Sequence, residues 1–410
     1  SSDVCSSDLL RGLALLGPAI VAGVAYLDPG NVATNLSAGA AYGFSLTWVI
    51  ALATLTAWLV QYLSAKLGLV TGKTVPELLG ERFRTDGRRI SFWIQAEAVA
   101  IATDVAEVIG GAIALNLLFD LPVLVGGVIT GIISMLLLSL QSRGLLRVFE
   151  TVILGLVLVT GVGFFAALVI APPSAPAIVA GLVPKFSDSG SVLLAAGMVG
   201  ATIMPHAIYA HSALSRDRFA GLIDTSNLKR LIRATKIDVT IAMVIAGSIN
   251  LAILFMAATS LFGVKMGDAI YTAYLALNAD LGHTVAALFA FGLLASGLAS
   301  SSVGTYAGGV ISSGLLRRKW SPLLLRAMTL VPALLVLAVS SDPTSALVYS
   351  QVLLSFGLPF ALFPLVRLTS DARLMGENAN SRATRILGYF VASLITALNV
   401  YLLAVFALGH

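Results

Sequence analysis

Long runs without a charged side chain recur throughout this sequence of 410 residues, for example at 121–141, 151–184, 239–264 and 284–316. A run of about 20 apolar residues can cross the hydrocarbon core of a bilayer as an α-helix. Hydrophobic residues make up 58% of the chain and charged residues 11%, which is more apolar surface than a water-soluble domain needs. The runs predict an all-α integral membrane protein. They do not resemble the weak ten-residue alternation of a transmembrane β-barrel.

We expect eleven spans in one transmembrane domain over residues 11–410, after a disordered or non-native segment at 1–10. Charged segments at 73–89 and 216–236 and a proline-rich loop at 171–176 are expected between spans. An amphipathic connector is expected around Lys265. The spans are expected at about 12–42, 45–69, 91–119, 123–140, 149–170, 191–214, 239–261, 284–316, 323–339, 345–365 and 386–408.

The basic residues predict the orientation of the chain. With the N-terminus in the cytoplasm, every Lys and Arg lies on the cytoplasmic side except Lys185, Lys265 and Arg326, in agreement with the positive-inside rule. Eleven crossings then place the C-terminus outside, and the expected location is the inner (cytoplasmic) cell membrane. The net charge of +5 belongs to these loops and does not indicate nucleic-acid binding. The single cysteine, Cys5, excludes an internal disulfide or a cysteine zinc cluster.

Two interruptions in the apolar runs carry polar groups to the depth of the bilayer centre. One is Asp28-Pro29-Gly30-Asn31 in the first span, and the other is Met204-Pro205-His206 in the sixth. Proline breaks the helical ladder at each site. Polar groups at this depth are costly and usually functional. We therefore predict that both spans are broken into half-helices.

The two breaks lie five spans apart, so they divide the chain into repeats at about 12–171 and 190–366 with an eleventh helix at about 386–408. The first repeat starts inside and the second outside, which inverts one relative to the other. Inverted repeats with paired broken helices and a site at the midplane are typical of secondary transporters. We predict a LeuT-like fold with a 5+5 inverted repeat.

The motifs also resemble those of a known family. The two interruptions, together with the acidic stretch 103–107 and the stretch 350–356, resemble the signature segments of the Nramp family of divalent metal–proton symporters, in order and on the corresponding spans. The resemblance covers the chain after about Leu9. It implies uptake of Mn²⁺ and Fe²⁺ together with protons. We expect this uptake to proceed by alternating access, with Cd²⁺ as a further substrate because of the mixed oxygen and sulfur donors described next.

The chemistry of the two breaks agrees with a metal substrate. Asp28 offers an anionic oxygen, Asn31 a neutral oxygen and Met204 a thioether, while each break frees a backbone carbonyl, at Ala25 and at Ala201. Sulfur favours softer transition metals over Mg²⁺ and Ca²⁺. The expected ligands are these five residues, with Gln351 as a further candidate.

Each candidate ligand also has a structural interpretation. Asp28 can act as the N-cap of the following half-helix, and Asn31 can satisfy broken backbone. A methionine in a membrane helix is often packing filler. Gln351 is about equally well explained as an interhelical hydrogen-bonding residue.

Protons need their own carriers. Glu97, Asp104 and Glu107 fall near one face of the third span, and Arg326 in the ninth is the one cation expected nearby. Acids on a membrane helix are too costly to face lipid, so a buried salt-bridge network and a proton relay are both open, and the relay is favoured. His206 and His211 follow the second break and can shuttle protons or bind metal. For His206 we favour a proton-linked role.

Other functions are weighed against this one. The main alternative is a LeuT-fold symporter of another substrate, such as an amino acid with sodium, and a second is an Nramp-related Mg²⁺ transporter. A channel fits an internally duplicated chain poorly. An enzyme is least expected, because no motif such as His-Glu-x-x-His occurs. Beyond the transported metal, protons and the bilayer, we expect no cofactor, no nucleic acid and no obligate protein partner.

Overall fold

The computed structural model describes Tyr26, residues 28–141, single positions between 155 and 168, and residues 172–219, 227–263, 269–318 and 320–408. Every regular element in this part of the chain is helical, which confirms the all-α prediction. Ala25, Lys265, the segment 1–10, the first half of the first span and most of the fifth lie outside the described residues.

The helices of the first repeat follow the expected spans closely. Their bounds are α3 Pro29–Tyr42, α4 Thr47–Thr71, α5 Val75–Arg82, α6 Asp86–Phe119 and α7 Val123–Gln141. Gly43, with φ 57°, turns the chain between α3 and α4, a conformation that glycine adopts readily. The short helix α9, Ala175–Gly181, begins inside the stretch expected to be a loop, because Pro176 lies in its first turn, where a missing N–H costs nothing.

The second repeat and the last helix complete the bundle. The bounds are α10 Ser189–Ile203, α11 Pro205–Phe219, α12 Leu228–Ser260, α13 Ala269–Leu281, α14 His283–Leu316, α15 Pro322–Val339, α16 Pro343–Thr369, α17 Ala372–Met375 and α18 Arg382–Leu408. Helix α13 was not predicted as a helix. Helix α12 begins eleven residues before the expected span, within the basic segment, because Lys and Arg are good helix formers.

Eight segments of the described chain are long and apolar enough to cross a membrane. Helix α3, the turn after it and α4 count as one of these segments, and so do α10 and α11 together. Helix α7 follows the expected fourth span. The fifth span cannot be compared.

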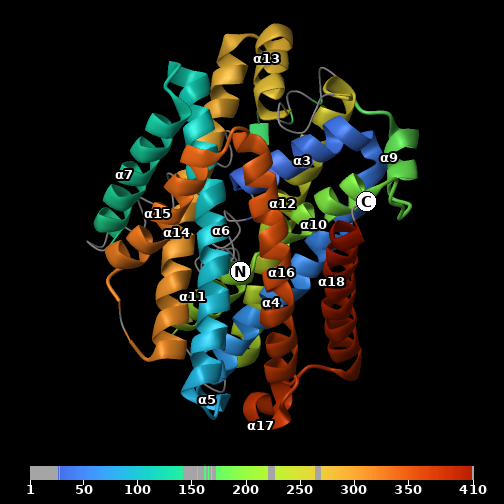
Figure 1. Ribbon diagram of the computed structural model, residues 1–410. Helices are drawn as coiled ribbons and strands as arrows, with labels where there is room; N and C mark the ends of the chain where they lie inside the picture. The colour runs from blue at the N-terminus through green and yellow to red at the C-terminus, as the bar shows by residue number, and fades with distance from the viewer. Residues whose placement is uncertain are drawn as a thin grey trace, which may run out of the picture.

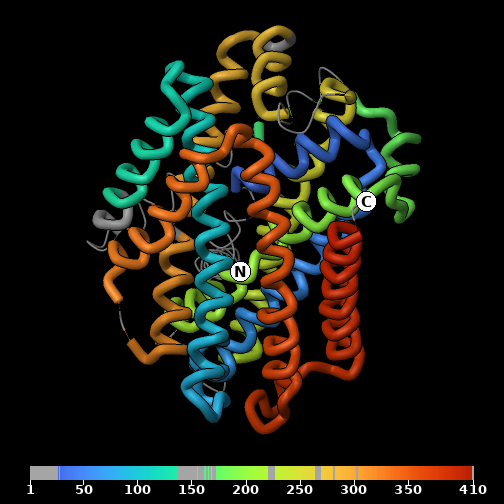
Figure 2. The backbone as a smooth tube through the Cα atoms, viewed as in Figure 1, coloured from blue at the N-terminus to red at the C-terminus, as the bar shows by residue number. Residues whose placement is uncertain are grey.

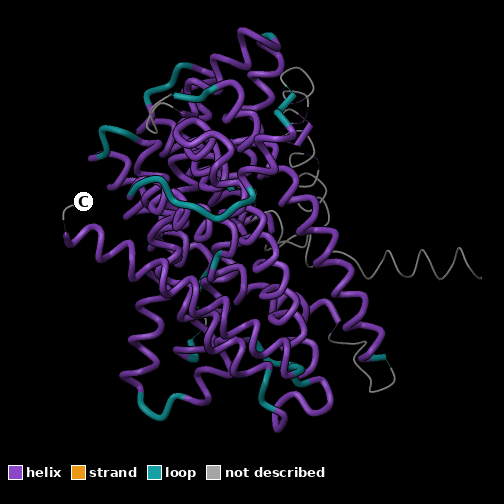
Figure 3. Tube along the Cα trace, turned by 90° about the vertical axis from the view of Figure 1, so that its right-hand side faces the viewer, coloured by secondary structure: helices purple, strands orange, loops and turns teal. Residues whose placement is uncertain are grey.

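Helix α6 lies in the middle of the bundle in Figure 1, with α14, α16, α15 and α7 packed against it. The smooth trace of Figure 2 shows α18 standing at the side of the bundle, where it contacts α16 and α10. The outer face of α18 exposes Phe390, Val400, Leu403 and Phe406, as expected of a helix that faces lipid. Figure 3, turned by 90°, shows the helices crossing at different tilts.

The lower end of the bundle in Figure 1 is called the basic end here. It contains α5, α17, the start of α6 and the end of α14. Two of the positively charged segments that the orientation prediction assigns to the cytoplasm, 82–89 and 317–318, lie at this end. The two helix breaks lie away from this end, in the buried middle of the molecule.

Candidate functional site

The sixth span is broken at Met204, as the sequence predicted. Helix α10 ends at Ile203 and α11 begins at Pro205, with Met204 between them at φ 36°. A positive φ is uncommon for a residue with a side chain. Pro205 has no N–H to continue the ladder, so the chain changes course here. Met204 is fully buried.

Asp28 caps the half-helix that follows the first break. Its Oδ1 accepts a hydrogen bond of 2.7 Å from the main-chain N–H of Asn31. Its Oδ2 is buried and has no hydrogen-bond partner among the described residues. The structural interpretation of Asp28 is therefore correct, yet it uses only one oxygen. A buried carboxylate oxygen without a donor is costly unless a cation or proton approaches it.

Asn31 joins the two breaks. Its Nδ2 donates to Asp28 Oδ1 and to the carbonyl oxygen of Ala201, each at 2.9 Å. Its Oδ1 accepts from the hydroxyl of Thr202 at 3.2 Å. Three of the predicted ligands therefore lie within one hydrogen-bonded group. The amide oxygen of Asn31, the atom that would bind a cation, is turned toward Thr202.

Gln351 on α16 lies against both broken helices. A Cβ atom at Gly30 would collide with the Gln351 side chain, and a Cβ atom at Gly200 would collide with the Gln351 carbonyl. Both glycines are needed for this close approach. Gln351 is fully buried and its Oε1 has no hydrogen-bond partner among the described residues. Gln351 is thus next to the group formed by Asp28 and Asn31.

This site has few formal charges. No group of three or more His, Cys, Asp and Glu side chains that could hold a metal occurs in the described part of the chain. A cation here would have to use a mixed set of donors: one carboxylate, amide and backbone oxygens, and a thioether.

Helix α6 brings its acids to a buried arginine. Arg326 on α15 forms an ion pair with Asp104, and its Nη1 lies 3.7 Å from Glu107 Oε2. Arg326 Nε also donates to Ser134 Oγ on α7 at 3.0 Å. Both oxygens of Glu107 are buried and lack hydrogen bonds among the described residues. The salt-bridge network expected from the sequence is therefore present for Asp104 and Glu107, and Glu97 is not part of it.

The acidic pair formed by Asp104 and Glu107 lies close to the first break. A Cβ atom at Gly110 would collide with the ring of Pro29, so α6 touches the residue that follows Asp28. Glu107 lies one helical turn before Gly110 on the same helix. The network around Arg326 and the group around Asp28 therefore border one another.

The other predicted proton carriers, His206, His211 and Glu97, are buried but are not bonded to Arg326. His206 Nδ1 lies 3.1 Å from the Thr103 hydroxyl, which ties α11 to α6 beside Asp104. His211 Nδ1 lies 2.7 Å from Gln61 Oε1 on α4. Glu97 is 8% exposed and forms none of the ion pairs found in the described residues. Of these three, His206 is the one adjacent to the acidic pair.

The sequence reasoning missed several polar partners. It did not single out Thr202 or Asn250, and Asn250 donates to the carbonyl of Tyr26 at 3.0 Å. Asn35 donates to Asn250 Oδ1 at 2.9 Å. A signal was available, because an asparagine inside an apolar span is costly unless it has a partner.

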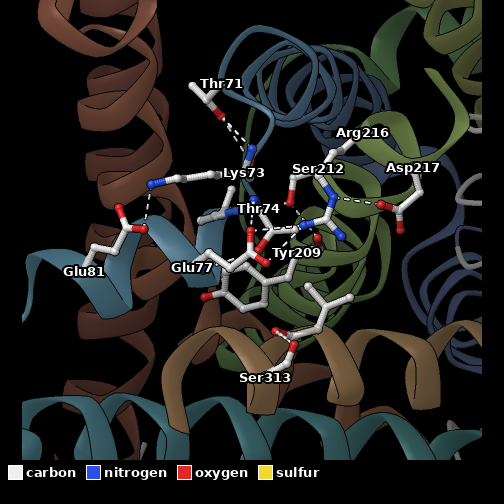
Figure 4. A network of polar contacts seen from close by, with 12 residues as sticks. Thr71, Lys73, Thr74, Glu77, Glu81, Tyr209, Ser212, Arg216, Asp217 and Ser313 are labelled. Carbon is white, nitrogen blue, oxygen red and sulfur yellow. Dashed lines mark hydrogen bonds and ion pairs between the residues drawn. The ribbon is translucent and has the colours of Figure 1, made fainter. Parts of the chain in front are cut away.

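A second polar network, at the basic end, ties α5 to α11 (Figure 4). Glu77 on α5 accepts from Arg216 Nη1 at 3.0 Å and 3.1 Å, and the main-chain N–H of Val75 donates to Ser212 Oγ at 3.2 Å. Thr74 and Glu77 form a capping box that fixes the start of α5. A Cβ atom at Gly80 would collide with the Gly314 carbonyl, so α5 also rests directly on α14. Helix α5, which lies within the charged segment expected between the second and third spans, is thus anchored to two helices.

Comparison with known proteins gives consistent matches over nearly the whole chain. The family model for natural resistance-associated macrophage protein-like (Nramp) proteins matches residues 19–405. The divalent metal cation transporter MntH of Mycobacterium tuberculosis (strain H37Rv) is 53% identical over 389 residues, covering 95% of this chain and 91% of the relative. MntH of Bacillus subtilis (strain 168) is 46% identical over 399 residues, covering 96% and 92%.

Solved structures agree with the fold. A crystal structure of the Eremococcus coleocola manganese transporter, in complex with an aromatic bis-isothiourea compound, superposes with a TM-score of 0.85 at 30% identity, covering 96% of this chain and 87% of that one. Mhp1, a nucleobase-cation-symport-1 family transporter with the LeuT fold, superposes with a TM-score of 0.57 at 13% identity. The match covers 94% of this chain and 90% of that one. At that identity the likeness concerns the fold alone. The predicted LeuT-like fold is confirmed.

Proposed function

The chain belongs to the Nramp family, and from this premise we propose that it takes up Mn²⁺, and also Fe²⁺ and Cd²⁺, together with protons by alternating access. Transport of divalent metal cations, manganese among them, is the function of the protein. It is a multi-pass membrane transporter and not an enzyme. We propose in addition which residues bind the ion, which route the protons take and how the chain is oriented in the membrane.

The position of the Asn31 amide carries the proposal for the metal site. Its two N–H groups point at Asp28 Oδ1 and the Ala201 carbonyl, each 2.9 Å away. A carboxylate oxygen and a backbone carbonyl oxygen are also ligands that bind divalent metal ions. We propose that the ion replaces the NH₂ group and that the amide rotates to offer Oδ1. The unpartnered Oδ2 of Asp28 and the Met204 thioether would complete the protein ligands, with Ala25 and Gln351 as further candidates.

Proton coupling is proposed for the network on α6. Glu107 has two buried oxygens without hydrogen bonds and lies 3.7 Å from the guanidinium of Arg326, which also holds Asp104. A proton arriving with the metal has Asp28 or Glu107 as an acceptor, and Arg326 compensates the charge that remains. His206, held by Thr103, is a further carrier on this route. Glu97 and His211 are proposed at its margins.

We propose that the N-terminus and the basic end face the cytoplasm and that the C-terminus faces the outside of the inner membrane. The concentration of Lys and Arg at the basic end supports this orientation. The network of Figure 4 then closes the cytoplasmic side, because Arg216 and Glu77 join α11 to α5 below the site. Movement of the half-helices would have to release this contact for the ion to leave.

Uptake into proteoliposomes with internal pH followed in parallel tests the proposal. With a more acidic exterior, the intact protein is expected to accumulate Mn²⁺ while the interior acidifies, and to discriminate against Mg²⁺ and Ca²⁺. Uptake of Mn²⁺ without any acidification of the interior would show that transport is not coupled to protons. Equal uptake of Mg²⁺ would favour the Mg²⁺-transporter alternative.

A further inference from the structure

A cleft lies at the basic end, apart from the proposed metal site. It has a volume of about 430 Å³ and lies between the start of α6 and the end of α14. Its polar lining comes from Asp86, Arg89 and Arg318, and its aromatic lining from Trp93 and Trp320. The transport function uses none of these residues.

The charge of the cleft is positive. Asp86, its one acidic lining residue, is already paired with Arg89, whose side chain is only 20% exposed. Arg318 is exposed and forms no ion pair with a described residue. Arg88 and Arg317, each next to a lining arginine in the sequence, are exposed as well. Arg318 therefore gives the cleft a positive charge that no carboxylate among the described residues pairs with.

The aromatic lining marks the level of a membrane surface. Trp93 and Trp320 meet edge to face, with ring centroids 5.7 Å apart, and Trp93 Nε1 donates to Ser312 Oγ at 3.3 Å. Tryptophan is enriched where the bilayer meets water. Apolar side chains that belong against hydrocarbon lie on the same helices and on the start of α15: Ile90, Ile94, Leu323 and Leu324, which are 46%, 56%, 48% and 50% exposed.

We propose that this cleft binds the headgroup of an anionic phospholipid. The phosphate lies between Arg89 and Arg318, and the acyl chains run along the exposed apolar side chains of α6 and α15. Clusters of Lys and Arg at the end of membrane helices attract anionic lipid, whereas a zwitterionic headgroup brings no net charge. The inference is independent of the proposed metal site, since it needs only this end of the bundle at the bilayer surface.

Native mass spectrometry of the full-length protein in detergent tests this inference, with phosphatidylglycerol or phosphatidylcholine added to the micelles. We expect phosphatidylglycerol to be retained preferentially. Arg318→Gln leaves the Asp86–Arg89 pair intact and should weaken retention about fivefold, and the double variant Arg89→Gln/Arg318→Gln about 30-fold. Arg318→Lys keeps the charge and should retain the lipid. If the double variant does not fold, the comparison of Arg318→Gln with Arg318→Lys tests whether the charge at this position holds the lipid.

The matched control is Arg373→Gln/Arg385→Gln, which removes two exposed arginines at the same end but outside the cleft. It should retain phosphatidylglycerol as the intact protein does. An equal loss in the control would mean that net charge alone attracts the lipid, and would overturn the proposal. Displacement of the lipid by millimolar inorganic phosphate would also overturn it, because the cleft would then be a site for free anions.

Discussion

The side-chain amide of Asn31 donates a hydrogen bond of 2.9 Å to the main-chain carbonyl of Ala201, 170 residues away in the sequence. This bond joins the start of α3 to the end of α10. The Ala201 carbonyl has no helical partner, because Pro205, four residues later, has no N–H, so this oxygen is available to the Asn31 side chain or to a substrate. In the proposed metal site the ion takes the place of the Asn31 NH₂ group, so this bond would open when the ion binds.

Thr202→Val should strengthen Mn²⁺ binding. The Thr202 hydroxyl holds the Asn31 amide oxygen away from Asp28, and a hydrogen bond of this kind is worth about 1 kcal/mol. Its loss frees the oxygen to face the ion, so the KM for Mn²⁺ uptake should fall about fivefold. Thr34→Val is the control, since the Thr34 hydroxyl binds only the main-chain carbonyls of Gly30 and Asn31. A higher KM in Thr202→Val would contradict the proposed rotation.

Met204→Ala should reduce discrimination against Mg²⁺. The thioether favours softer ions, and alanine removes it while leaving the oxygen ligands in place. Competition of Mg²⁺ with Mn²⁺ uptake in proteoliposomes measures the effect, and about a tenfold loss of selectivity is expected, equivalent to about 1.4 kcal/mol. Met198→Ala removes an equally buried methionine from α10, the helix that ends just before Met204, and should keep the selectivity. Equal selectivity in Met204→Ala and the intact protein would dismiss the thioether as a ligand.

Gly200→Ala should lower the thermal stability and stop uptake. The added Cβ collides with the main chain at Gln351, which cannot move without shifting α16, and overpacking of this kind costs about 1–3 kcal/mol. At Gly197, one turn earlier, the nearest contact of an added Cβ is a Thr34 methyl group at 3.2 Å. Gly197→Ala should therefore unfold nearly as the intact protein does. Equal melting temperatures for the two variants would show that α16 is not tightly seated at Gly200.

Glu107→Gln should lower the number of protons moved per Mn²⁺ ion. The amide cannot take up a proton in the range where the carboxyl does, although it fills the same space beside Arg326. Glu97→Gln should have a smaller effect, because Glu97 is not paired with Arg326. Parallel traces of Mn²⁺ uptake and internal pH give the ratio. Glu81→Gln, at an exposed pair with Lys73, serves as control, and an unchanged ratio in Glu107→Gln would exclude it from the proton route.

Much of the fold follows from the sequence because apolar runs and prolines act locally. The break at Met204-Pro205 needs no knowledge of other helices, since proline removes a helical hydrogen bond wherever it lies. Helices α6 and α12 begin earlier than the expected spans for a different reason, whereas their last residues agree to within one position. Hydrophobicity marks the hydrocarbon core, whereas a helix of 33 residues such as α12 is about 50 Å long and extends beyond a core of about 30 Å.

The site was predicted in its residue types but not in its pairings. Asp28, Asn31 and Ala201 could be named from the breaks. The orientation of the Asn31 amide could not, because it depends on Thr202, which only the packing of α10 against α3 brings into reach. The anchoring of α5 by Arg216 likewise depends on a contact between segments 139 residues apart, which no local pattern encodes.

Calorimetric titration of the purified protein with Mn²⁺ tests the metal site most directly. Asp28→Asn keeps the cap of α3, because asparagine is also a favoured N-cap, but removes the only carboxylate charge among the proposed ligands. Asp120→Asn, at an exposed position with φ 58° that asparagine tolerates, is the matched control. The account predicts that Asp28→Asn loses saturable Mn²⁺ binding while Asp120→Asn keeps it. Binding of Mn²⁺ by Asp28→Asn with the Kd of the intact protein would contradict it.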